Sequence, residues 1–484
     1  MKKNIVTMLK KVYKFGLISV VATVVCSSLQ SCEGYPEDNA GSQPNVVSTR
    51  ADVSEMPGDK YGVTQRMAEI FISSNKENPP IVSVEPYEID GVTCFYIFNF
   101  EAGFKVVSAD TRVQPILAES DKGCLVPSET DNPGVKVWLE DTADRIRVLK
   151  ENNADTGEDY SGLWSAYRLP EKREALTTRS YDVDSVWVLV YNTSSTYTSF
   201  NANVGPLLST EWGQGSPWNN KMPKIGGTKC VTGCVAVATA QVLYYFNRRY
   251  MAPKDFWETI SIQNTSLCPT HGGLLVTLNK SNYNSNSSKW NTMTSNTDNV
   301  SYLMLDLGER LEMHYGTNDS GVVLAGDYSI PNLTSCGISS SFDSFSFPTV
   351  RSDLLNEKPV IITASQDYNA DFHTWVIDGC KDYSIMITTT ATYYCVHPDE
   401  LINYPNNDGV LSYEEMLTQH PDANGHVYQV SQTTYDHQQS LYMNWGWDGY
   451  LNGWYNFLDP ADPIYSQYVY HRVIHYNINT TQLN

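Results

Sequence analysis

The chain is short of positive charge. Its 484 residues include 33 lysines and arginines against 54 aspartates and glutamates, which gives a formal net charge of −21 at pH 7. Nucleic-acid-binding proteins contact phosphates mainly through clustered Lys and Arg, so this balance argues against binding to DNA or RNA. The acidity fits a soluble exported protein but does not identify a substrate.

The N-terminus lacks a hydrophobic run long enough to cross a membrane. Its apolar stretch, Phe15 to Val25, is eleven residues long, whereas a spanning helix needs about 20. A basic segment precedes this stretch, and the combination is typical of a secretory signal peptide. The following Leu29-Gln30-Ser31-Cys32 resembles a bacterial lipobox, which predicts cleavage after residue 31 and acylation of Cys32. An ordinary signal peptide cleaved nearby is the alternative.

The ten cysteines do not follow the spacing of a zinc site or a disulfide framework. Apart from two in the leader and Cys234, seven remain, an odd number without a C-x-x-C pair. The sequence therefore predicts no metal site at these residues and leaves any disulfide pairing open. The seven are Cys94, Cys124, Cys230, Cys268, Cys336, Cys380 and Cys395.

The segment from Cys230 to Phe246 is the most informative part of the chain. A Thr-Gly pair leads into Cys234, where a nearly uninterrupted apolar helical pattern begins. A thiol on the first turn of a helix faces the positive end of the helix dipole, which lowers its pKa and favours the nucleophilic thiolate. An isolated cysteine of this kind can also be a small buried hydrophobic residue, so the interpretation depends on other segments.

Three further segments supply the partners that a cysteine protease needs. These are a histidine to pair with the thiolate, a side chain to orient that histidine, and a donor for the oxyanion. His373 precedes the β-branched run Thr374 to Ile377 and is expected at the head of a strand, with a turn at Asp378-Gly379. Asn444 ends another expected strand, and Gln214 lies in a Gly- and Pro-rich loop. The order Gln, Cys, His, Asn is that of papain-like enzymes.

Around these residues the chain resembles the streptopain family of bacterial cysteine proteases. The matching stretches are W-G-Q-G-S-P-W-N, T-G-C-V-A-V-A-T-A-Q, H-T-W-V-I-D-G and N-W-G-W-D-G-Y-L-N-G-W-Y, with a weaker match at M-H-Y-G-T-N-D-S-G. The resemblance implies five catalytic residues: the nucleophile Cys234, the general base and acid His373, the oxyanion donor Gln214, and Asn444 and Trp445, which hold and shield the imidazole.

The resemblance also implies substrate-binding residues at Ser320, Gly321, Phe372 and Trp447. The chain departs from the family at Phe372, because the family has a glycine immediately before the catalytic histidine. A glycine lets the substrate backbone come close, so this departure affects the substrate contact rather than the chemistry. A second departure is an insertion at about 381–440, next to the cleft, where the family has a short hairpin. We expect strand from Pro359 onward except in this insertion.

A folded domain without catalytic residues is predicted ahead of the catalytic one. Thr93 to Phe100 and Gly103 to Ala109 have the pattern of a hairpin, and apolar residues at helical spacing follow Asn132-Pro133-Gly134. The phrase F-N-F-E-A-G-F-K-V-V-S-A-D-T-R-V-Q-P-I-L-A-E-S-D resembles the propeptide of the same protease family. A generic α+β binding module is the alternative.

The predicted fold class is α+β. A papain-like cysteine protease domain, built from a nucleophile helix plus an antiparallel sheet, follows a small α+β propeptide domain. A polar, basic segment at Pro170 to Ser180 is the expected maturation linker. The predicted organisation is a lipoprotein signal peptide at 1–31, a flexible tether at 32–53, the propeptide or inhibitory domain at 54–180 and the catalytic domain at 181–484.

One segment of the insertion partly matches a calcium-binding loop. In residues 404–415, Gly409 occupies the sixth position and Glu415 the twelfth. Tyr404 occupies the first ligand position and cannot coordinate a cation. We therefore expect an Asn-Asp-Gly turn followed by a short helix, and no cofactor.

These observations predict an exported cysteine endopeptidase made as a zymogen. It would hydrolyse protein or peptide substrates, be inhibited by its own propeptide, and be lipid-anchored to the bacterial outer membrane, where it could face the cell surface. Two alternatives stay open: a catalytically silent adhesion or binding protein on a protease scaffold, and an acyl transferase using the same Cys-His pair. An intact Gln/Cys/His/Asn set argues against the first alternative.

Overall fold

The computed structural model describes residues 61–75, 77–152, 160, 163–164, 186–250, 263–264, 276–277, 297–365, 372–396, 403, 409–423, 427–457 and 471–480. The predicted signal peptide, Cys32, the tether and the 170–180 linker lie outside these ranges. The chain separates into two units, 1–54 and 55–484, and the described residues all belong to the second. Within the described ranges, no helix is long and apolar enough to cross a membrane.

The N-terminal part of this unit is a small α+β arrangement. Four antiparallel strands form a meander, and the predicted hairpin of the second and third strands is confirmed. The predicted helix after Asn132 is also confirmed; Asn132 Oδ1 accepts hydrogen bonds from Gly134 N and Val135 N, which caps the helix. The elements are α1 (Gln65–Ser74), β1 (Ile81–Ile89), β2 (Val92–Phe100), β3 (Phe104–Ser108), β4 (Ile116–Ser120) and α2 (Pro133–Asn152).

The C-terminal part places a buried helix beside an antiparallel sheet. Its helices are α4 (Cys234–Tyr250), α6 (Thr297–Arg310), η4 (Leu333–Cys336) and α7 (Phe347–Leu355). Its main strands are β10 (Ile338–Ser344), β11 (Val360–Ser365), β12 (His373–Val396), β14 (Val427–Asn444), β15 (Gly453–Tyr455) and β16 (His471–Thr480). Two short pairs are β6 (Lys224–Ile225) with β7 (Thr228–Lys229), and β8 (Gln263–Asn264) with β9 (Val276–Thr277).

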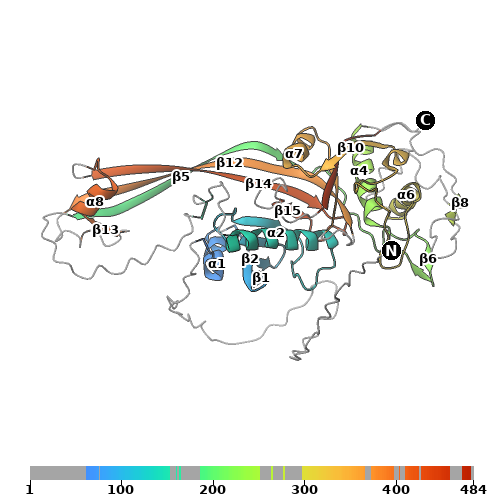
Figure 1. The fold of residues 1–484 in the computed structure, drawn as a ribbon, viewed down its shortest axis with the longest axis horizontal. Coiled ribbons are helices and arrows are strands. Elements are labelled where there is room, and N and C mark those ends of the chain that lie inside the picture. Colours follow the sequence, from blue (N-terminus) through green and yellow to red (C-terminus); the bar gives the residue numbers. More distant parts are fainter. Residues whose placement is uncertain are drawn as a thin grey trace, which may run out of the picture. The chain divides into compact units, whose positions relative to one another are not determined.

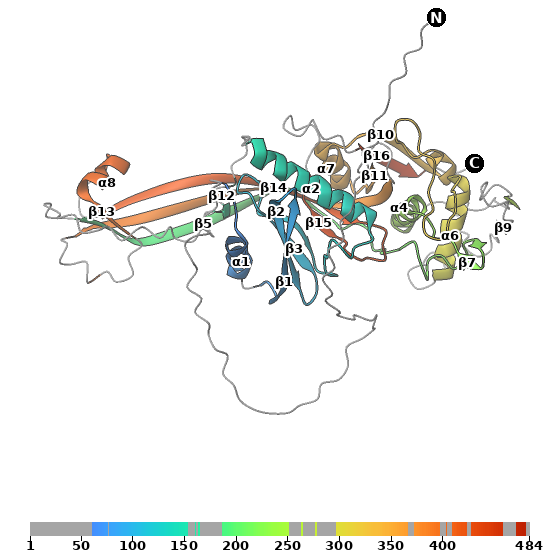
Figure 2. The same ribbon diagram turned by 60° about the horizontal axis from the view of Figure 1, so that its bottom comes forward.

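The two parts share one continuous sheet. Strand β4 pairs with β15 through Glu119 opposite Trp454 and Ala118 opposite Tyr455, so the strand order runs β1-β2-β3-β4-β15-β14-β12-β11-β16-β10 (Figures 1 and 2). Helix α2 packs across this junction, because Trp138 lies in one buried cluster with side chains of both halves of the sheet. The α+β class predicted from the sequence, with a helix and an antiparallel sheet following a smaller N-terminal part, is confirmed.

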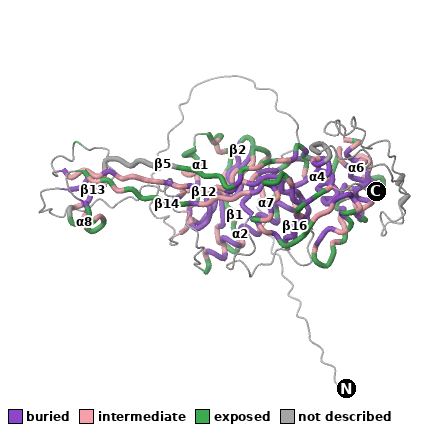
Figure 3. Tube along the Cα trace, turned by 90° about the horizontal axis from the view of Figure 1, so that it is seen from above, coloured by how far each residue is buried: buried purple, intermediate pink, exposed green. Residues whose placement is uncertain are grey.

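The insertion at 381–440 corrects our expectation, because most of its described residues are strand. Strands β12 and β14 continue as a long antiparallel pair, and β5 (Val186–Val204) pairs along the other edge of β12. At the far end lie β13 (Gly409–Ser412) and α8 (Tyr413–Gln419), and Figure 3 shows mainly half-buried and exposed residues along these strands. The frequent Thr, Ile and Tyr side chains of β12 suit such a sheet.

The turn expected at Asp378-Gly379 is also wrong. Strand β12 runs through these residues, with an irregularity in its pairing to β14 between Ile377 and Gly379. A Cβ at Gly379 would lie 2.8 Å from Tyr442 Cβ. The glycine is therefore required by close packing within the sheet rather than by a turn.

The short helix predicted after the Asn-Asp-Gly sequence is confirmed as α8. Ser412 Oγ accepts a hydrogen bond from Glu415 N, and Ser412 N donates to Glu415 Oε2 at 2.9 Å, which forms a capping box. The carboxylate at the twelfth position of the calcium-like pattern thus serves as a helix cap. The turn itself lies outside the described residues, as does Cys268. Free thiols are found at Cys94, Cys124, Cys234, Cys336, Cys380 and Cys395.

Candidate active site

Cys234 is the first residue of α4 and only 9% exposed. The preceding Gly233 has a φ of 87°, and a Cβ there would lie 2.8 Å from Met313 Sδ and 2.9 Å from Ser320 O. The Thr-Gly-Cys sequence therefore lets the chain enter the helix against a closely packed loop. Burial raises the pKa of the Cys234 thiol to about 11, although a hydrogen bond with the Thr374 backbone opposes this. Desolvation thus outweighs the helix dipole, contrary to the lowered pKa expected from the sequence.

His373 begins β12, as predicted, and is 2% exposed. Its Nε2 lies 3.0 Å from Trp445 O. Because a carbonyl can only accept, Nε2 carries the hydrogen and Nδ1 keeps the lone pair. Burial lowers the pKa of the imidazole to about 4, so His373 is neutral at pH 7 and has an acceptor nitrogen available for a proton.

The structure brings Cys234 to the head of the strand that carries His373. The thiol has a hydrogen bond with Thr374, the residue next to His373, and another with the Val235 backbone. The pKa of the thiol is raised and that of the imidazole is lowered, so both groups are uncharged at neutral pH. This is a resting arrangement of the two groups, not the thiolate–imidazolium pair that would attack a substrate.

The N-terminal turn of α2 covers the imidazole. A Cβ at Gly134 would lie 2.9 Å from His373 Cδ2 and 2.5 Å from Trp445 Cε3. Gly134 and Asn132 are both buried. A turn of the N-terminal domain therefore lies against the candidate general base and contributes to the burial that keeps it neutral.

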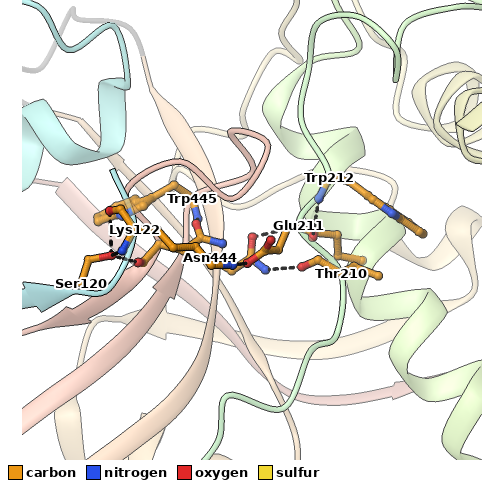
Figure 4. Close-up of polar contacts among 9 residues, drawn as sticks. Ser120, Lys122, Thr210, Glu211, Trp212, Asn444 and Trp445 are labelled. Carbon is orange, nitrogen blue, oxygen red and sulfur yellow. Dashed lines mark hydrogen bonds and ion pairs between the residues drawn. The ribbon is translucent and has the colours of Figure 1, made fainter. Parts of the chain in front are cut away.

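Asn444 and Trp445 lie beside His373 but contact it differently from the sequence-based expectation. The Asn444 side chain donates to Thr210 O at 2.7 Å and accepts from Gln241 Nε2 at 3.2 Å, and Figure 4 shows it directed toward Thr210 and Trp212. The main-chain carbonyl of Trp445, not the Asn444 amide, is the partner of His373. The Trp445 indole is fully buried.

Gln214 lies on the loop beside the nucleophile helix. Its carbonyl accepts a hydrogen bond from Thr232 N at 3.0 Å, two residues before Cys234. The loop is held by Trp212, which is buried with its ring centroid 5.3 Å from that of Tyr244 on α4. Gln214 is therefore near the start of α4, and its role as oxyanion donor stays a prediction.

Of the four predicted substrate-binding residues, two lie beside His373 and two lie on the loop that packs against the chain before Cys234. Trp447 contacts the imidazole edge-on, with ring centroids 5.7 Å apart, and Phe372 packs on Tyr328 at 5.0 Å. Ser320 is buried and donates to Val231 O at 2.8 Å, while Gly321 has open space where a Cβ would stand. Ser320 thus supports the loop before Cys234, and the substrate contacts of all four stay predictions.

Two buried polar residues near the site were missed by sequence reasoning. Gln241 lies seven residues after Cys234 on α4, and Asp378 lies five residues after His373 on β12. Burial raises the pKa of Asp378 to about 7, and its Oδ2 accepts from Leu208 N at 2.9 Å. A polar residue at helical spacing from the nucleophile, within an apolar helix, was the signal available for Gln241.

Comparison with known proteins relates both parts of the chain to described families. The profile of the Peptidase C10 family matches residues 212–455, and that of the Spi protease inhibitor matches residues 64–146. Streptopain of Streptococcus pyogenes is 26% identical over 235 residues, which are 46% of this chain. The aligned region spans 50% of the length of streptopain.

Two solved structures of Prevotella intermedia proteins are also similar. A fragment of prointerpain A is 20% identical, with a TM-score of 0.44 over 83% of this chain and 100% of that fragment. The active interpain A cysteine protease is 20% identical, with a TM-score of 0.33 over 57% of this chain and 95% of the other.

Proposed function

Because the chain belongs to the peptidase C10 family, which matches half of its length, we propose that it is a cysteine endopeptidase that hydrolyses protein substrates. One observation carries the proposal: a thiol on the first turn of a buried helix meets the head of the strand that bears a neutral histidine with an acceptor Nδ1. This is the arrangement from which a thiolate–imidazolium pair forms once the site is opened.

In the open site, His373 Nδ1 takes the proton of the Cys234 thiol. The thiolate attacks the peptide carbonyl carbon, and the oxyanion is stabilised by the amide of Gln214 and the start of α4. The imidazolium then protonates the departing amine, which leaves a thioester on Cys234. Water attacks the thioester while His373 accepts its proton, and the carboxylic acid product is released with regeneration of the thiol.

The chain is made as a zymogen in this proposal. The segment that matches the Spi protease inhibitor includes the α2 turn against His373. Two further contacts fix it to the catalytic part: Trp138 Nε1 donates to Asn456 O at 2.8 Å, and Asp141 pairs with Arg472. Removal of this segment would uncover the imidazole, raise its pKa toward the ordinary range and allow the ion pair to form.

Export and lipid anchoring complete the proposal and are supported by the sequence alone. A basic segment and a short apolar run precede Leu29-Gln30-Ser31-Cys32, and acyl chains on Cys32 would hold the protein on a membrane without a spanning helix. The bacterial outer membrane is the destination we propose.

Active-site labelling tests the enzymatic part directly. An epoxysuccinyl probe should modify the processed chain at Cys234, whereas the intact precursor should react at least about tenfold more slowly because its imidazole is buried. Peptide mapping identifies the modified residue. Labelling at another cysteine, or no peptide hydrolysis by the processed chain, would contradict the proposal. A labelled Cys234 with transfer to an added amine in place of hydrolysis would indicate the acyl transferase.

A further inference from the structure

Gln241 is a buried polar residue on the helix that begins with Cys234. It follows Cys234 by seven residues, so about 100° of rotation per residue returns it to nearly the same face, roughly 10 Å along the axis. Its side chain is fully buried in a helix whose neighbouring residues are mainly apolar. Because burying an amide is costly unless it is hydrogen-bonded, the partners of Gln241 indicate what it does.

The partners lie on two other elements of the site. Gln241 Oε1 accepts a hydrogen bond from Trp212 N at 3.2 Å, and its Nε2 donates to Asn444 Oδ1 at 3.2 Å. Asn444 Nδ2 in turn donates to Thr210 O at 2.7 Å, a contact visible in Figure 4. A backbone N–H can only donate and a carbonyl can only accept, so Trp212 and Thr210 fix the orientation of both amides.

These hydrogen bonds form a closed ring, from Trp212 through Gln241 and Asn444 to Thr210, which the backbone joins back to Trp212. Asn444 directly precedes Trp445, whose carbonyl accepts from His373 Nε2. Trp212 precedes Gly213 and the candidate oxyanion donor Gln214. Gln241 therefore connects the helix of the nucleophile, the strand end that orients the imidazole, and the loop of the oxyanion donor.

We propose that Gln241 is a positioning residue for the hydrolytic reaction. It acts through Asn444 and Trp212 and touches neither substrate nor the reacting atoms. The inference rests on the proposed function, since it concerns the alignment of Cys234, His373 and Gln214. In this proposal Gln241 holds the amide of Asn444, and the next residue, Trp445, provides the carbonyl that accepts from His373.

The chemistry of the ring requires one acceptor and one donor at position 241. Glutamate keeps the acceptor for Trp212 N but places a second oxygen against Asn444 Oδ1, unless its carboxyl is protonated and donates. Burial would raise the pKa of that carboxyl above its usual value. Gln241→Glu is thus an almost isosteric change whose effect on kcat should depend on pH, and kcat per competent site separates misalignment from loss of folded protein.

The test measures kcat and KM on a peptide substrate between pH 5 and 8. Each full-length variant is processed with a trace of wild-type enzyme, whose own activity is measured in parallel. Gln241→Glu should lower kcat about 10- to 100-fold at pH 8, as expected when reacting groups are misplaced by about 1 Å, with KM changed less than about threefold. Its kcat relative to wild type should recover toward pH 5. Gln241→Leu should have a lower kcat than wild type at every pH.

Thr239→Val is the matched control. It removes a buried hydroxyl on the same helix that has no hydrogen-bond partner in the described part of the chain, so its kinetics and pH profile should equal those of wild type. Titration with an epoxysuccinyl probe counts competent sites in each preparation. If Gln241→Leu does not fold, the pH-dependent recovery of Gln241→Glu remains the deciding measurement.

The results separate the two proposals. A wild-type kcat per titrated site in Gln241→Glu, or a reduced kcat with the wild-type pH profile, overturns the positioning role while leaving the enzyme intact. Wild-type protein that hydrolyses no peptide overturns the proposed function, and the positioning role with it.

Discussion

The buried ion pair between the N-terminal domain and the catalytic part should contribute much of the free energy that favours the closed precursor over the open one. Asp141 on α2 is 2% exposed and contacts Arg472 on β16, which is 4% exposed, as well as Arg145 one helical turn away. The Arg472 guanidinium also lies 4.2 Å from the centroid of the Phe457 ring. Asp141→Asn would leave two buried guanidinium groups facing a neutral amide.

The magnitude follows from the burial of these groups. Removing one partner of a buried pair costs about 3–5 kcal/mol because the remaining charge is uncompensated. Asparagine can still accept a hydrogen bond, so we expect a loss of about 3 kcal/mol for the closed precursor. At about 1.4 kcal/mol per factor of ten, the open fraction should increase about 100-fold.

The assay compares full-length precursors. Asp141→Asn should convert to the processed form about 100-fold faster than wild type at low enzyme concentration, and in a Cys234→Ala background it should unfold at a lower temperature. Asp144→Asn is the control on the same helix: its partner Arg147 lies within α2 at 3.0 Å, and a pair of that kind contributes about 0–1 kcal/mol. Equal processing rates for Asp141→Asn and wild type would refute the reasoning.

Three other predictions follow from the site and the leader. Cys234→Ala and His373→Ala should each lower peptide hydrolysis by at least about 1,000-fold while the Cys234→Ala chain stays at precursor length, and wild-type rates in either would exclude its role. Because the proton that His373 gains on opening comes from the neutral Cys234 thiol, opening takes up no net proton between about pH 5 and 8; the labelling rate of the precursor should stay nearly constant there, and a steep rise as the pH falls would contradict this. Cys32→Ser should move the protein from the detergent phase to the aqueous phase, whereas aqueous wild-type protein would refute lipidation.

Local patterns predicted the elements that carry the chemistry. The apolar periodicity after Cys234 gave α4, and the β-branched residues after His373 gave the start of β12. These succeeded because each depends on neighbours in sequence. The predicted turn at Asp378-Gly379 was wrong because the glycine is required by close packing against Tyr442, on a strand about sixty residues later. No local sequence pattern indicates that contact.

The partner of His373 could not be predicted for a related reason. The sequence suggested the Asn444 side chain, whereas the structure uses the carbonyl of the next residue. Whether a side chain or a main-chain carbonyl reaches the imidazole depends on how the chain leaves β14 after Asn444, which the local sequence does not specify. Here Asn444 is directed to Thr210 and Gln241, and both contacts come from elements more than 200 residues earlier.

The shared sheet connects the N-terminal domain to the residues that orient His373. Strand β15 pairs with β14 on one edge and with β4 on the other, and it leads from the loop that contains Trp445 and Asn452. Asn452 Oδ1 accepts from Trp445 N at 2.9 Å, and Asn452 O accepts from Ser120 Oγ, on β4, at 2.6 Å. The N-terminal domain therefore supports, through one residue, the carbonyl that orients His373. On the proposed function, a domain that covers the imidazole with α2 and holds its partner with β4 would close the site while preserving its geometry, so release of α2 would be the step that activates the enzyme.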